Sequence, residues 1–307
     1  MAETLTVIPT NYVDAANARL DLYLVAGDTE AVLIDAGIST SPADGVTDLV
    51  RAALDGRRLS AILITHAHVD HVGGATALRD EFGARILVPR DDLGWIEDPE
   101  YQWQAFWGTC SDEFDIGASR AQILEWSGPP LAADGVLRPG DRVAVDGGAV
   151  RAILTRAHTP GHTCYFAEES RVLFTGDYVQ LRGNPSADGA TVFPPLYDSV
   201  TDYLHGLAAL AAEPFERLAT AHRGVLTREE GLAAIAESEA FTRETAQLTR
   251  DLAVDGVTVA SLAGAIAART GAAEPLSVQS VITARAHIRH EHESRTISAV
   301  TEGRWRS

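Results

Sequence analysis

The segment that most constrains the fold of this chain is Thr65–Gly74, which reads Thr-His-Ala-His-Val-Asp-His-Val-Gly-Gly. It places three imidazoles and one carboxylate in the six positions from His66 to His71, directly after the apolar run Ala61–Ile64. Neutral imidazole and carboxylate are the ligands that zinc and related divalent metals prefer. A strand that ends in such donors predicts a metal site at the edge of a sheet. The alternative is a polar loop that binds nothing.

Further potential ligands stand elsewhere in the chain, each at or close to the end of an apolar run. They are Asp35, His162, Asp177 and His222. Strand ends at one edge of a sheet are places where active sites are commonly built. These residues therefore argue against a loop that binds nothing, and they indicate a larger metal site assembled from several strands.

With these residues the sequence resembles the metallo-β-lactamase superfamily, whose signature is His-x-His-x-Asp-His followed by a distant His, Asp and His. The resemblance implies an α/β fold, an αββα sandwich with metals at one edge, over a catalytic domain at 1–228. It also implies a set of metal ligands: His66, His68 and His162 for the first metal, Asp70, His71 and His222 for the second, and Asp177 as the bridge. Two Zn²⁺ are the implied cofactors, with iron or manganese as alternatives.

The chemistry of such a ligand set agrees with two metals. Seven ligands are too many for one tetrahedral zinc, whereas two metals about 3.5–4 Å apart can hold a bridging hydroxide and polarise a substrate oxygen. Such a centre provides a nucleophile without a serine or cysteine. Asp70 is expected to bind metal first and to help in catalytic proton transfer second. Asp35 is expected to orient a ligating imidazole or its loop, with a turn-capping role as the alternative.

The departures from the family pattern point to one branch. Zinc β-lactamases commonly have Cys or Ser where this chain has Asp177, and many use a lysine for the antibiotic carboxylate, whereas all 25 basic residues here are arginine. Asp177 resembles instead the glyoxalase II-like branch, whose members hydrolyse thioesters, esters, lactones or phosphodiesters. The acyl-homoserine lactonases place a tyrosine where this chain has Gln180, and the glutathione-binding residues of glyoxalase II cannot be matched. We therefore expect a metal-dependent hydrolase of a thioester, ester or lactone that acts through a metal-bridging hydroxide.

An insertion at about 91–134 holds four of the five tryptophans. Trp103, Phe106 and Trp107 have the i, i+3, i+4 spacing of one helix face. Two readings remain open. The three residues form an apolar lid that binds a hydrophobic small-molecule substrate, or they form the core of an inserted helix pair.

Residues next to the ligands are also candidates. Tyr178 is a candidate catalytic residue and Arg223 a candidate for substrate binding, since either could stabilise an oxyanion; a purely structural role is the alternative for both. His158 is expected to stand at a strand end or behind the ligands rather than to act as an eighth ligand, because Pro160 and Gly161 interrupt any helix between it and His162.

Composition limits the partners and the compartment. The net charge of −18 argues against a nucleic-acid partner. No apolar run approaches the roughly 20 residues of a membrane span, and Met1–Thr4 shows no start of a secretory signal. The two cysteines have no metal-type spacing, and Cys164 is expected to pack in a sheet. We expect a cytoplasmic protein with no membrane partner.

Apolar patterns predict strands at 20–25, 31–35, 61–64 and 84–88 and helices at 43–54, 72–82 and 198–212. Further strands are expected at 142–145, 150–155, 163–166, 171–174 and 218–221. The region 229–307 is expected to be a helical, winged-helix-like appendage that serves packing or homodimerisation and walls the substrate pocket. Its His287, His290 and His292 are expected on a solvated helix face.

Two other functions remain open. The first is redox chemistry, because the sulfur dioxygenases of this superfamily hold one non-haem iron with two His and an Asp. The second is a metal-stabilised binding scaffold without activity. One iron per chain with oxygen consumption would indicate the first, and no hydrolysis by metal-loaded protein would indicate the second.

Overall fold

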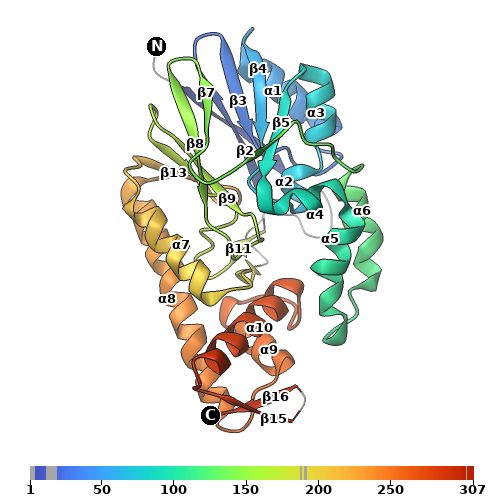
Figure 1. The fold of residues 1–307 in the computed structure, drawn as a ribbon, viewed down its shortest axis with the longest axis vertical. Coiled ribbons are helices and arrows are strands. Elements are labelled where there is room, and N and C mark those ends of the chain that lie inside the picture. The colour runs from blue at the N-terminus through green and yellow to red at the C-terminus, as the bar shows by residue number, and fades with distance from the viewer. Residues whose placement is uncertain (1–3, 12–18, 187–188, 190–191, 302) are drawn as a thin grey trace.

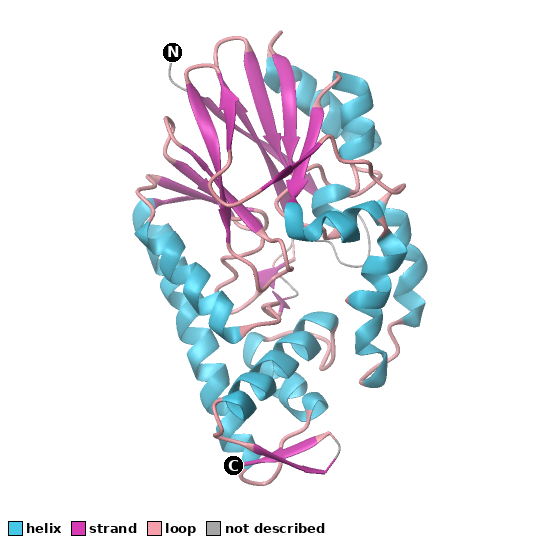
Figure 2. Ribbon diagram, viewed as in Figure 1, coloured by secondary structure: helices cyan, strands magenta, loops and turns pink. Residues whose placement is uncertain are grey.

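The computed structural model describes residues 4–11, 19–186, 189, 192–301 and 303–307. Two six-stranded sheets face each other, and helices cover their outer faces (Figures 1 and 2). This is the αββα sandwich that the sequence predicts, with a helical C-terminal appendage. Met1–Glu3, which bear on the expected absence of a secretory signal, lie outside the described residues.

The first sheet has the order β1-β2-β3-β4-β5-β6, antiparallel up to β3 and parallel from β3 onward. Its strands are β1 (Thr4–Asn11), β2 (Arg19–Ala26), β3 (Glu30–Ile34), β4 (Arg58–Leu63), β5 (Arg85–Pro89) and β6 (Gly135–Leu137). The connecting helices are η1 (Pro42–Val46), α1 (Thr47–Leu54), α2 (Val69–Val72) and α3 (Ala75–Phe82).

The second sheet has the order β14-β13-β10-β9-β8-β7. Its strands are β7 (Arg142–Val145), β8 (Gly148–Leu154), β9 (Thr163–Ala167), β10 (Val172–Phe174), β13 (Arg217–Thr220) and β14 (Gly224–Thr227). Helices α7 (Val200–Ala212) and α8 (Arg228–Ala253) cover its outer face (Figure 1). A short pair, β11 (Asn184–Pro185) and β12 (Val192–Phe193), lies between the sandwich and the C-terminal helices.

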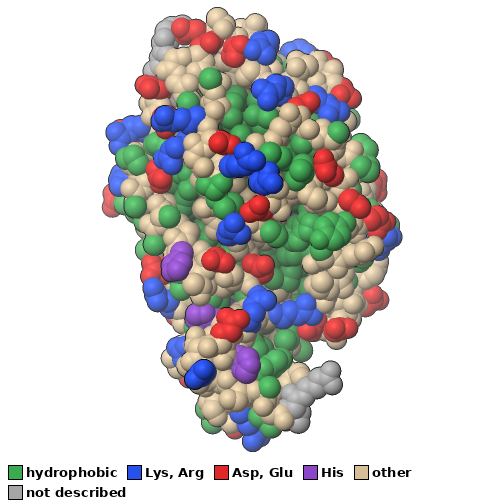
Figure 3. All heavy atoms as spheres, in the orientation of Figure 1, with side chains coloured by type: hydrophobic (Ala, Val, Ile, Leu, Met, Phe, Trp, Pro, Cys, Tyr) green, Lys and Arg blue, Asp and Glu red, His purple; other side chains and the backbone are tan. Residues whose placement is uncertain are grey.

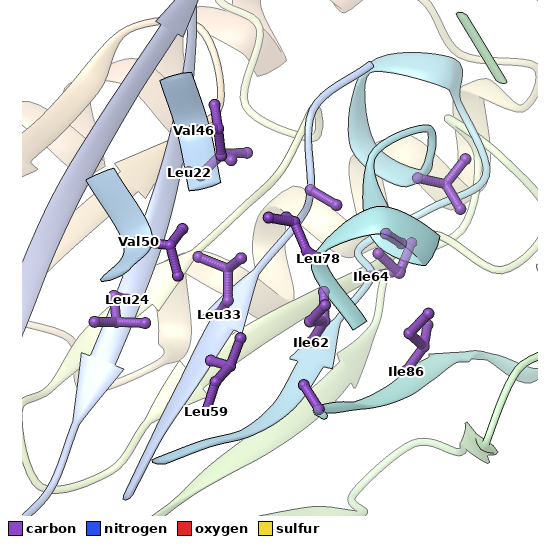
Figure 4. Close-up of a cluster of buried hydrophobic side chains, with 14 of the residues drawn as sticks. Leu22, Leu24, Leu33, Val46, Val50, Leu59, Ile62, Ile64, Leu78 and Ile86 are labelled. Carbon is purple, nitrogen blue, oxygen red and sulfur yellow. The ribbon is translucent and has the colours of Figure 1, made fainter. Parts of the chain in front are cut away.

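Alternation along the strands builds the cores. On β2, Leu22 and Leu24 pack outward against Val46 and Val50 of the covering helices (Figure 4), whereas Tyr23 faces the second sheet. This two-residue period is what a strand between two apolar layers requires. The sheets therefore share one inner core, and each has an outer core under its helices.

The insertion and the C-terminal region share a further core. The insertion consists of η2 (Arg90–Asp92), α4 (Leu93–Glu97), α5 (Pro99–Ala105), η3 (Trp107–Asp112), η4 (Gly117–Ser119) and α6 (Arg120–Ser127). The C-terminal region continues after α8 with α9 (Val259–Thr270), α10 (Val278–Glu293), β15 (Ser298–Thr301) and β16 (Arg304–Arg306). Phe106 and Ile116 of the insertion pack in one cluster with Phe241, Leu262 and Val281. The two segments, far apart in sequence, are thus held together by buried apolar surface.

The strands predicted at 20–25, 31–35, 61–64 and 84–88 are confirmed as β2 to β5, and those of the second half as β7 to β10 and β13. The sequence missed β1, β6 and β14. The helix expected at 72–82 corresponds to α3, which begins only at Ala75, and Val72 is the last residue of the separate helix α2. The expectation for His287 is wrong: the residue is fully buried, and its Nε2 lies 2.8 Å from the hydroxyl of Tyr197.

Acidic and basic side chains are intermingled on the face of the molecule that Figure 3 shows. Within the described residues, no helix has the length and apolar character that crossing a bilayer demands.

Candidate metal centre

The ligand cluster follows β4 at the edge of the first sheet, where the chain turns through His66 and His68 into α2. Two glycines allow the turn to pack closely. A Cβ at Gly73 would lie 2.0 Å from the carbonyl oxygen of Trp126, and one at Gly74 would lie 2.3 Å from that of Ala36. Only glycine fits such backbone contacts, so the Gly-Gly pair fixes the start of the helical segment against the site.

The structure gathers the donor atoms into two groups, within each of which they lie within 4.8 Å of one another. One group is His66, His68 and His158, and the other is Asp70, His71, Asp177 and His222. His162 lies beside the first group, its ring centroid 4.9 Å from that of His66. Its Nε2 is buried and has no hydrogen-bond partner among the described residues. The structure therefore places six of the seven predicted ligands in these two groups, and His158, which the sequence analysis set apart from the ligands, stands in the first group where His162 was expected.

Contacts behind the imidazoles fix their orientation. Nδ1 of His71 lies 2.8 Å from Oδ2 of Asp35, and Nδ1 of His222 lies 2.6 Å from the carbonyl oxygen of Arg19. Nδ1 of His162 lies 2.8 Å from the hydroxyl of Thr155. Such contacts on one ring nitrogen hold the other, Nε2, for a metal.

Asp35 makes two further contacts. It accepts a hydrogen bond of 2.7 Å from the backbone N–H of Thr65 and one of 2.9 Å from the Thr65 hydroxyl. Its φ of 62° lies in the left-handed region, which is costly for a residue other than glycine and persists where the surroundings impose it. Asp35 thus holds both His71 and the start of the ligand loop.

The electrostatics of the two donor groups differ. Burial holds the pKa of His66, His68 and His162 well below the ordinary histidine value, so these imidazoles are neutral. Burial alone would also lower the pKa of His222, but Asp177 and Asp70 raise it to about 9. Burial alone would raise the pKa of Asp177, yet His222 and His71 hold it well below the usual carboxyl range.

These residues fit a metal centre. The first group offers neutral nitrogen donors, and the second gathers carboxylates around imidazoles whose protons a divalent cation would replace. Asp177 reaches both groups: its Oδ1 lies 3.1 Å from Nε2 of His222, and its Oδ2 lies 3.6 Å from Nε2 of His158.

Asp92 is a site residue that the sequence analysis missed. It is fully buried and accepts hydrogen bonds from the N–H of Ala67 at 2.9 Å, the N–H of Gly161 at 2.6 Å and the hydroxyl of Thr159 at 2.6 Å. Burial raises its pKa to about 6. Asp92 therefore joins the loop of His66 and His68 to the loop of His158 and His162. Its place in η2, the short helix that follows β5 at the same sheet edge, was the available signal.

A cavity of about 470 Å³ opens beside the donors. His68, Asp70, His158, Asp177 and His222 stand in its wall. The insertion contributes Trp107, Phe114, Ile116, Ile123 and Trp126, and the C-terminal region contributes Leu276 and Val278. No arginine is among the described residues that line this cavity, and Glu274 is its one charged side chain outside the metal ligands and His158. The cavity is thus mostly apolar and carries no fixed cation.

The three aromatic residues of the insertion differ in position, so the lid interpretation and the core interpretation apply to different members. Trp107 lines the cavity, with its ring centroid 5.0 Å from that of His68. Phe106 is buried beneath it, 5.1 Å from His68. Trp103 packs into the core shared with the C-terminal region and lies under the guanidinium of Arg120. Of the three, only Trp107 has the position of a lid residue.

Tyr178 and Arg223 do not reach the cavity. The hydroxyl of Tyr178 is buried 2.8 Å from the carbonyl oxygen of Thr155 and 2.9 Å from that of Asp202. A hydroxyl engaged with the backbone in this way cannot stabilise an oxyanion, so the expected catalytic role of Tyr178 does not fit its position. The guanidinium of Arg223 donates to the carbonyl of Gly183, and the residue is outside the cavity wall.

Comparisons with known proteins agree with this geometry. The family model described as metallo-beta-lactamase superfamily matches residues 21–226. A hydroxyacylglutathione hydrolase of Rhizobium meliloti (strain 1021) is 28% identical over 167 residues, 53% of this chain and 52% of that protein. A beta-lactamase-like protein 2 homolog of Caenorhabditis elegans is 28% identical over 184 residues, 58% of this chain and 48% of that protein. The chain thus spans about half the length of these two curated relatives.

Solved structures show the same fold over nearly the whole chain. A metallo-beta-lactamase family protein from Thermus thermophilus has a TM-score of 0.76 at 22% identity, over 98% of each chain. A beta-lactamase domain protein from Burkholderia ambifaria has a TM-score of 0.73 at 17% identity, over 98% of this chain and 91% of that chain. The likeness therefore includes the insertion and the C-terminal helices.

Proposed function

Because this chain belongs to the metallo-β-lactamase superfamily, we propose that it is a dinuclear metal-dependent hydrolase of a hydrophobic ester, thioester or lactone. The observation that carries the proposal is the pair of adjoining donor groups at one sheet edge, with Asp177 within reach of both. Zinc is the metal that we favour, because imidazole donors dominate the site.

Two divalent metals at this site would supply Lewis-acid activation of a substrate oxygen and a nucleophilic hydroxide near neutral pH. The chain itself supplies orientation and proton transfer. Asp35, Thr155 and the carbonyl of Arg19 hold three of the imidazoles in place. Asp70 lines the cavity, where its carboxylate can accept a proton from the attacking water or return one to the leaving group.

The cavity favours an uncharged, apolar substrate. Its wall combines Trp107, Phe114 and Trp126 with aliphatic side chains, and its described residues include no arginine. Glutathione carries two carboxylates, which would lie in this cavity without a cation to pair with them. We therefore propose a neutral acyl substrate for this chain rather than the glutathione thioester that the name of the R. meliloti relative implies.

The test uses purified protein reconstituted with Zn²⁺ and assayed on matched substrates. Neutral aryl esters, alkyl lactones and neutral acyl thioesters form one set, and S-lactoylglutathione and an acyl-CoA form the other. We expect hydrolysis of the neutral set with a kcat/KM at least tenfold above that of the anionic set. No hydrolysis in either set would overturn the proposal. Binding of a single iron with oxygen consumption on a persulfide would replace it with the dioxygenase function.

A further inference from the structure

The segment 194–198, called here the link, joins β12 to α7 and enters the cavity wall through Pro194 and Leu196. It begins with Pro194-Pro195, and the two rings fix φ at both positions. Leu196 and Tyr197, which follow, are buried. So short and stiff a segment moves as a unit, and contacts at any of its residues therefore set the position of the others.

One side of the link faces the metal donors. The carbonyl oxygen of Leu196 lies 2.8 Å from Nδ1 of His158, and a carbonyl can only accept a hydrogen bond. Nδ1 of His158 therefore carries the proton, and its Nε2, which lies 2.9 Å from Nδ1 of His68, keeps its lone pair. The N–H of Asp198 donates to the carbonyl of Ala157 at 2.7 Å. The link thus holds both the ring of His158 and the backbone before it.

The other side of the link is held by α10. The hydroxyl of Thr283 donates to the carbonyl of Pro195 at 2.7 Å and accepts from the N–H of Tyr197 at 3.3 Å. One turn further along the helix, Nε2 of His287 lies 2.8 Å from the hydroxyl of Tyr197. Thr283 and His287 are fully buried, and their spacing of four residues places them on one face of α10. Two successive turns of the helix therefore hold the backbone and a side chain of the link.

Gln180 holds the link from the side of the sandwich. Its Nε2 donates to the carbonyl of Leu196 at 3.0 Å, and its Oε1 accepts from the N–H of the same residue at 2.9 Å. Gln180 lines the cavity, but both ends of its amide are engaged by the backbone. The position of the Leu196 carbonyl is thus set by Gln180 on one side and by α10 on the other.

We propose that α10 is a positioning element of the metal centre. Through Thr283 and His287 it fixes the link, and the Leu196 carbonyl of the link fixes the orientation of His158. A hydrogen bond on one ring nitrogen presents the other nitrogen to a metal in a set direction, and loosening that bond lets the ring turn away. This inference rests on the proposed function only in requiring that the site binds metal. The C-terminal region then serves the metal centre as well as the wall of the cavity.

The test is Thr283→Val in the full chain, loaded with Co²⁺ alone. Valine has nearly the shape of threonine without its hydroxyl, so the variant loses the hydrogen bonds to Pro195 and Tyr197. We expect one Co²⁺ to bind roughly fivefold more weakly in chelator competition, the effect of one lost buried hydrogen bond. The visible absorption band of the bound metal should change with it.

Thr249→Val on α8 is the matched control. Thr249 is equally buried, but its hydroxyl donates to the carbonyl of Thr245 at 2.8 Å within the same helix. This variant should bind Co²⁺ as the wild type does. Thr283→Ser restores a hydroxyl and should recover the wild-type affinity and spectrum.

A double-mutant cycle separates positioning from a general loosening of the fold. In a His158→Asn background, Thr283→Val should weaken Co²⁺ binding no further, because its effect on the metal passes through His158. Near-UV circular dichroism checks the fold of each variant. Tyr197→Phe, which removes the hydroxyl that His287 contacts, serves as a second variant if Thr283→Val does not fold.

Wild-type Co²⁺ affinity and spectrum in both Thr283→Val and Tyr197→Phe would overturn the inference. An equal loss in Thr249→Val, or an undiminished effect of Thr283→Val in the His158→Asn background, would also overturn it, because the loss would then reflect stability and not the orientation of His158. The metal readouts need no substrate. A protein in which Thr283→Val weakens Co²⁺ binding as expected, but which hydrolyses nothing, would refute the proposed function and leave this inference standing.

Discussion

The guanidinium of Arg285 lies 2.5 Å from a carboxylate oxygen of Glu113, and this ion pair joins α10 to the insertion. Arg285 also donates to the carbonyl of Thr109 at 2.8 Å. Both walls of the cavity depend on the segments that this contact connects. The cavity is therefore walled by segments that lie far apart in the sequence.

Replacing Arg285 should loosen the pocket and leave the metal centre intact. We expect Arg285→Ala to raise KM for a neutral ester several-fold, with unchanged metal content and a stability loss of about 1 kcal/mol. Arg243→Ala removes an exposed i,i+4 pair with Glu239 and is the control. An unchanged KM would mean that the shared apolar core alone holds the walls.

Removing Asp177 should empty the centre. Its carboxylate lies within 3.4 Å of Nε2 of His71 and 3.1 Å of Nε2 of His222, so Asp177→Ala leaves these imidazoles without their shared partner. We expect loss of most bound metal and on the order of a hundredfold or more of kcat, with the fold retained. Metal analysis and circular dichroism test this. A variant that retains two metals would refute the assignment of the bridge.

Asp92→Asn should separate the two ligand loops. One carboxylate oxygen of Asp92 accepts hydrogen bonds from Ala67 and Thr159, and the other accepts one from Gly161. In the variant an amide nitrogen replaces one of these oxygens, and it cannot accept a hydrogen bond. We expect about 1–3 kcal/mol of lost stability and about 10–100-fold weaker metal binding. Asp91→Asn, at the half-exposed neighbour that pairs with Arg156, is the control. Equal metal affinity in both variants would contradict the role given to Asp92.

Two tryptophans should behave differently. Trp107→Ala should raise KM for a hydrophobic ester about tenfold, because Trp107 lines the cavity. Trp103→Ala should cost about 2 kcal/mol of stability with little change in KM, because Trp103 packs in the core shared with the C-terminal region. Kinetics and urea unfolding of both variants separate the two effects. A rise in KM for Trp103→Ala alone would reverse the assignment.

His287 should make the protein sensitive to acid. Burial, with smaller contributions from His290 and Arg250, lowers the pKa of His287 to about 3. Between pH 6.5 and 3 the unfolded chain binds a proton that the folded chain does not, so stability falls as pH falls. From pH 6.5 to 5 the free energy of unfolding falls by about 2 kcal/mol, because one pKa unit corresponds to ~1.4 kcal/mol.

His287→Gln removes this titration, and its amide can still bond the hydroxyl of Tyr197. Urea midpoints of the variant should therefore decline less between pH 6.5 and 5 than those of the wild type. His205→Gln, an exposed histidine variant, is the control. If the urea midpoints of the wild type and of His287→Gln fell equally between pH 6.5 and 5, His287 would not be the cause of the acid sensitivity.

The strands and the principal ligands could be predicted because their signals are local. An apolar run with donors directly after it, as at Ala61–Ile64 and His66, specifies both a strand and a sheet-edge site within a few residues. The same holds for Asp177 after β10 and His222 after β13.

Other site features depend on tertiary structure and left little local signal. Asp92 stands in Arg90-Asp91-Asp92, which in sequence reads as a solvated turn, and only the fold buries it between two loops. His158 is turned into the site by left-handed residues at Arg156 and Ala157, types that rarely adopt this conformation. Phe114 and Ile116 become cavity wall only because the insertion docks on the C-terminal helices.

The core that the insertion shares with the C-terminal region has a consequence for how such an enzyme can diversify. Leu276 and Val278 lie beyond residue 226, where the family match ends, while Trp107 and Phe114 belong to an insertion within it. Because Phe106 and Val281 pack in one cluster, a graft of either segment alone would strip apolar surface from the other. New substrate ranges are best engineered by exchanging the two segments as a matched pair on an unaltered metal-binding scaffold.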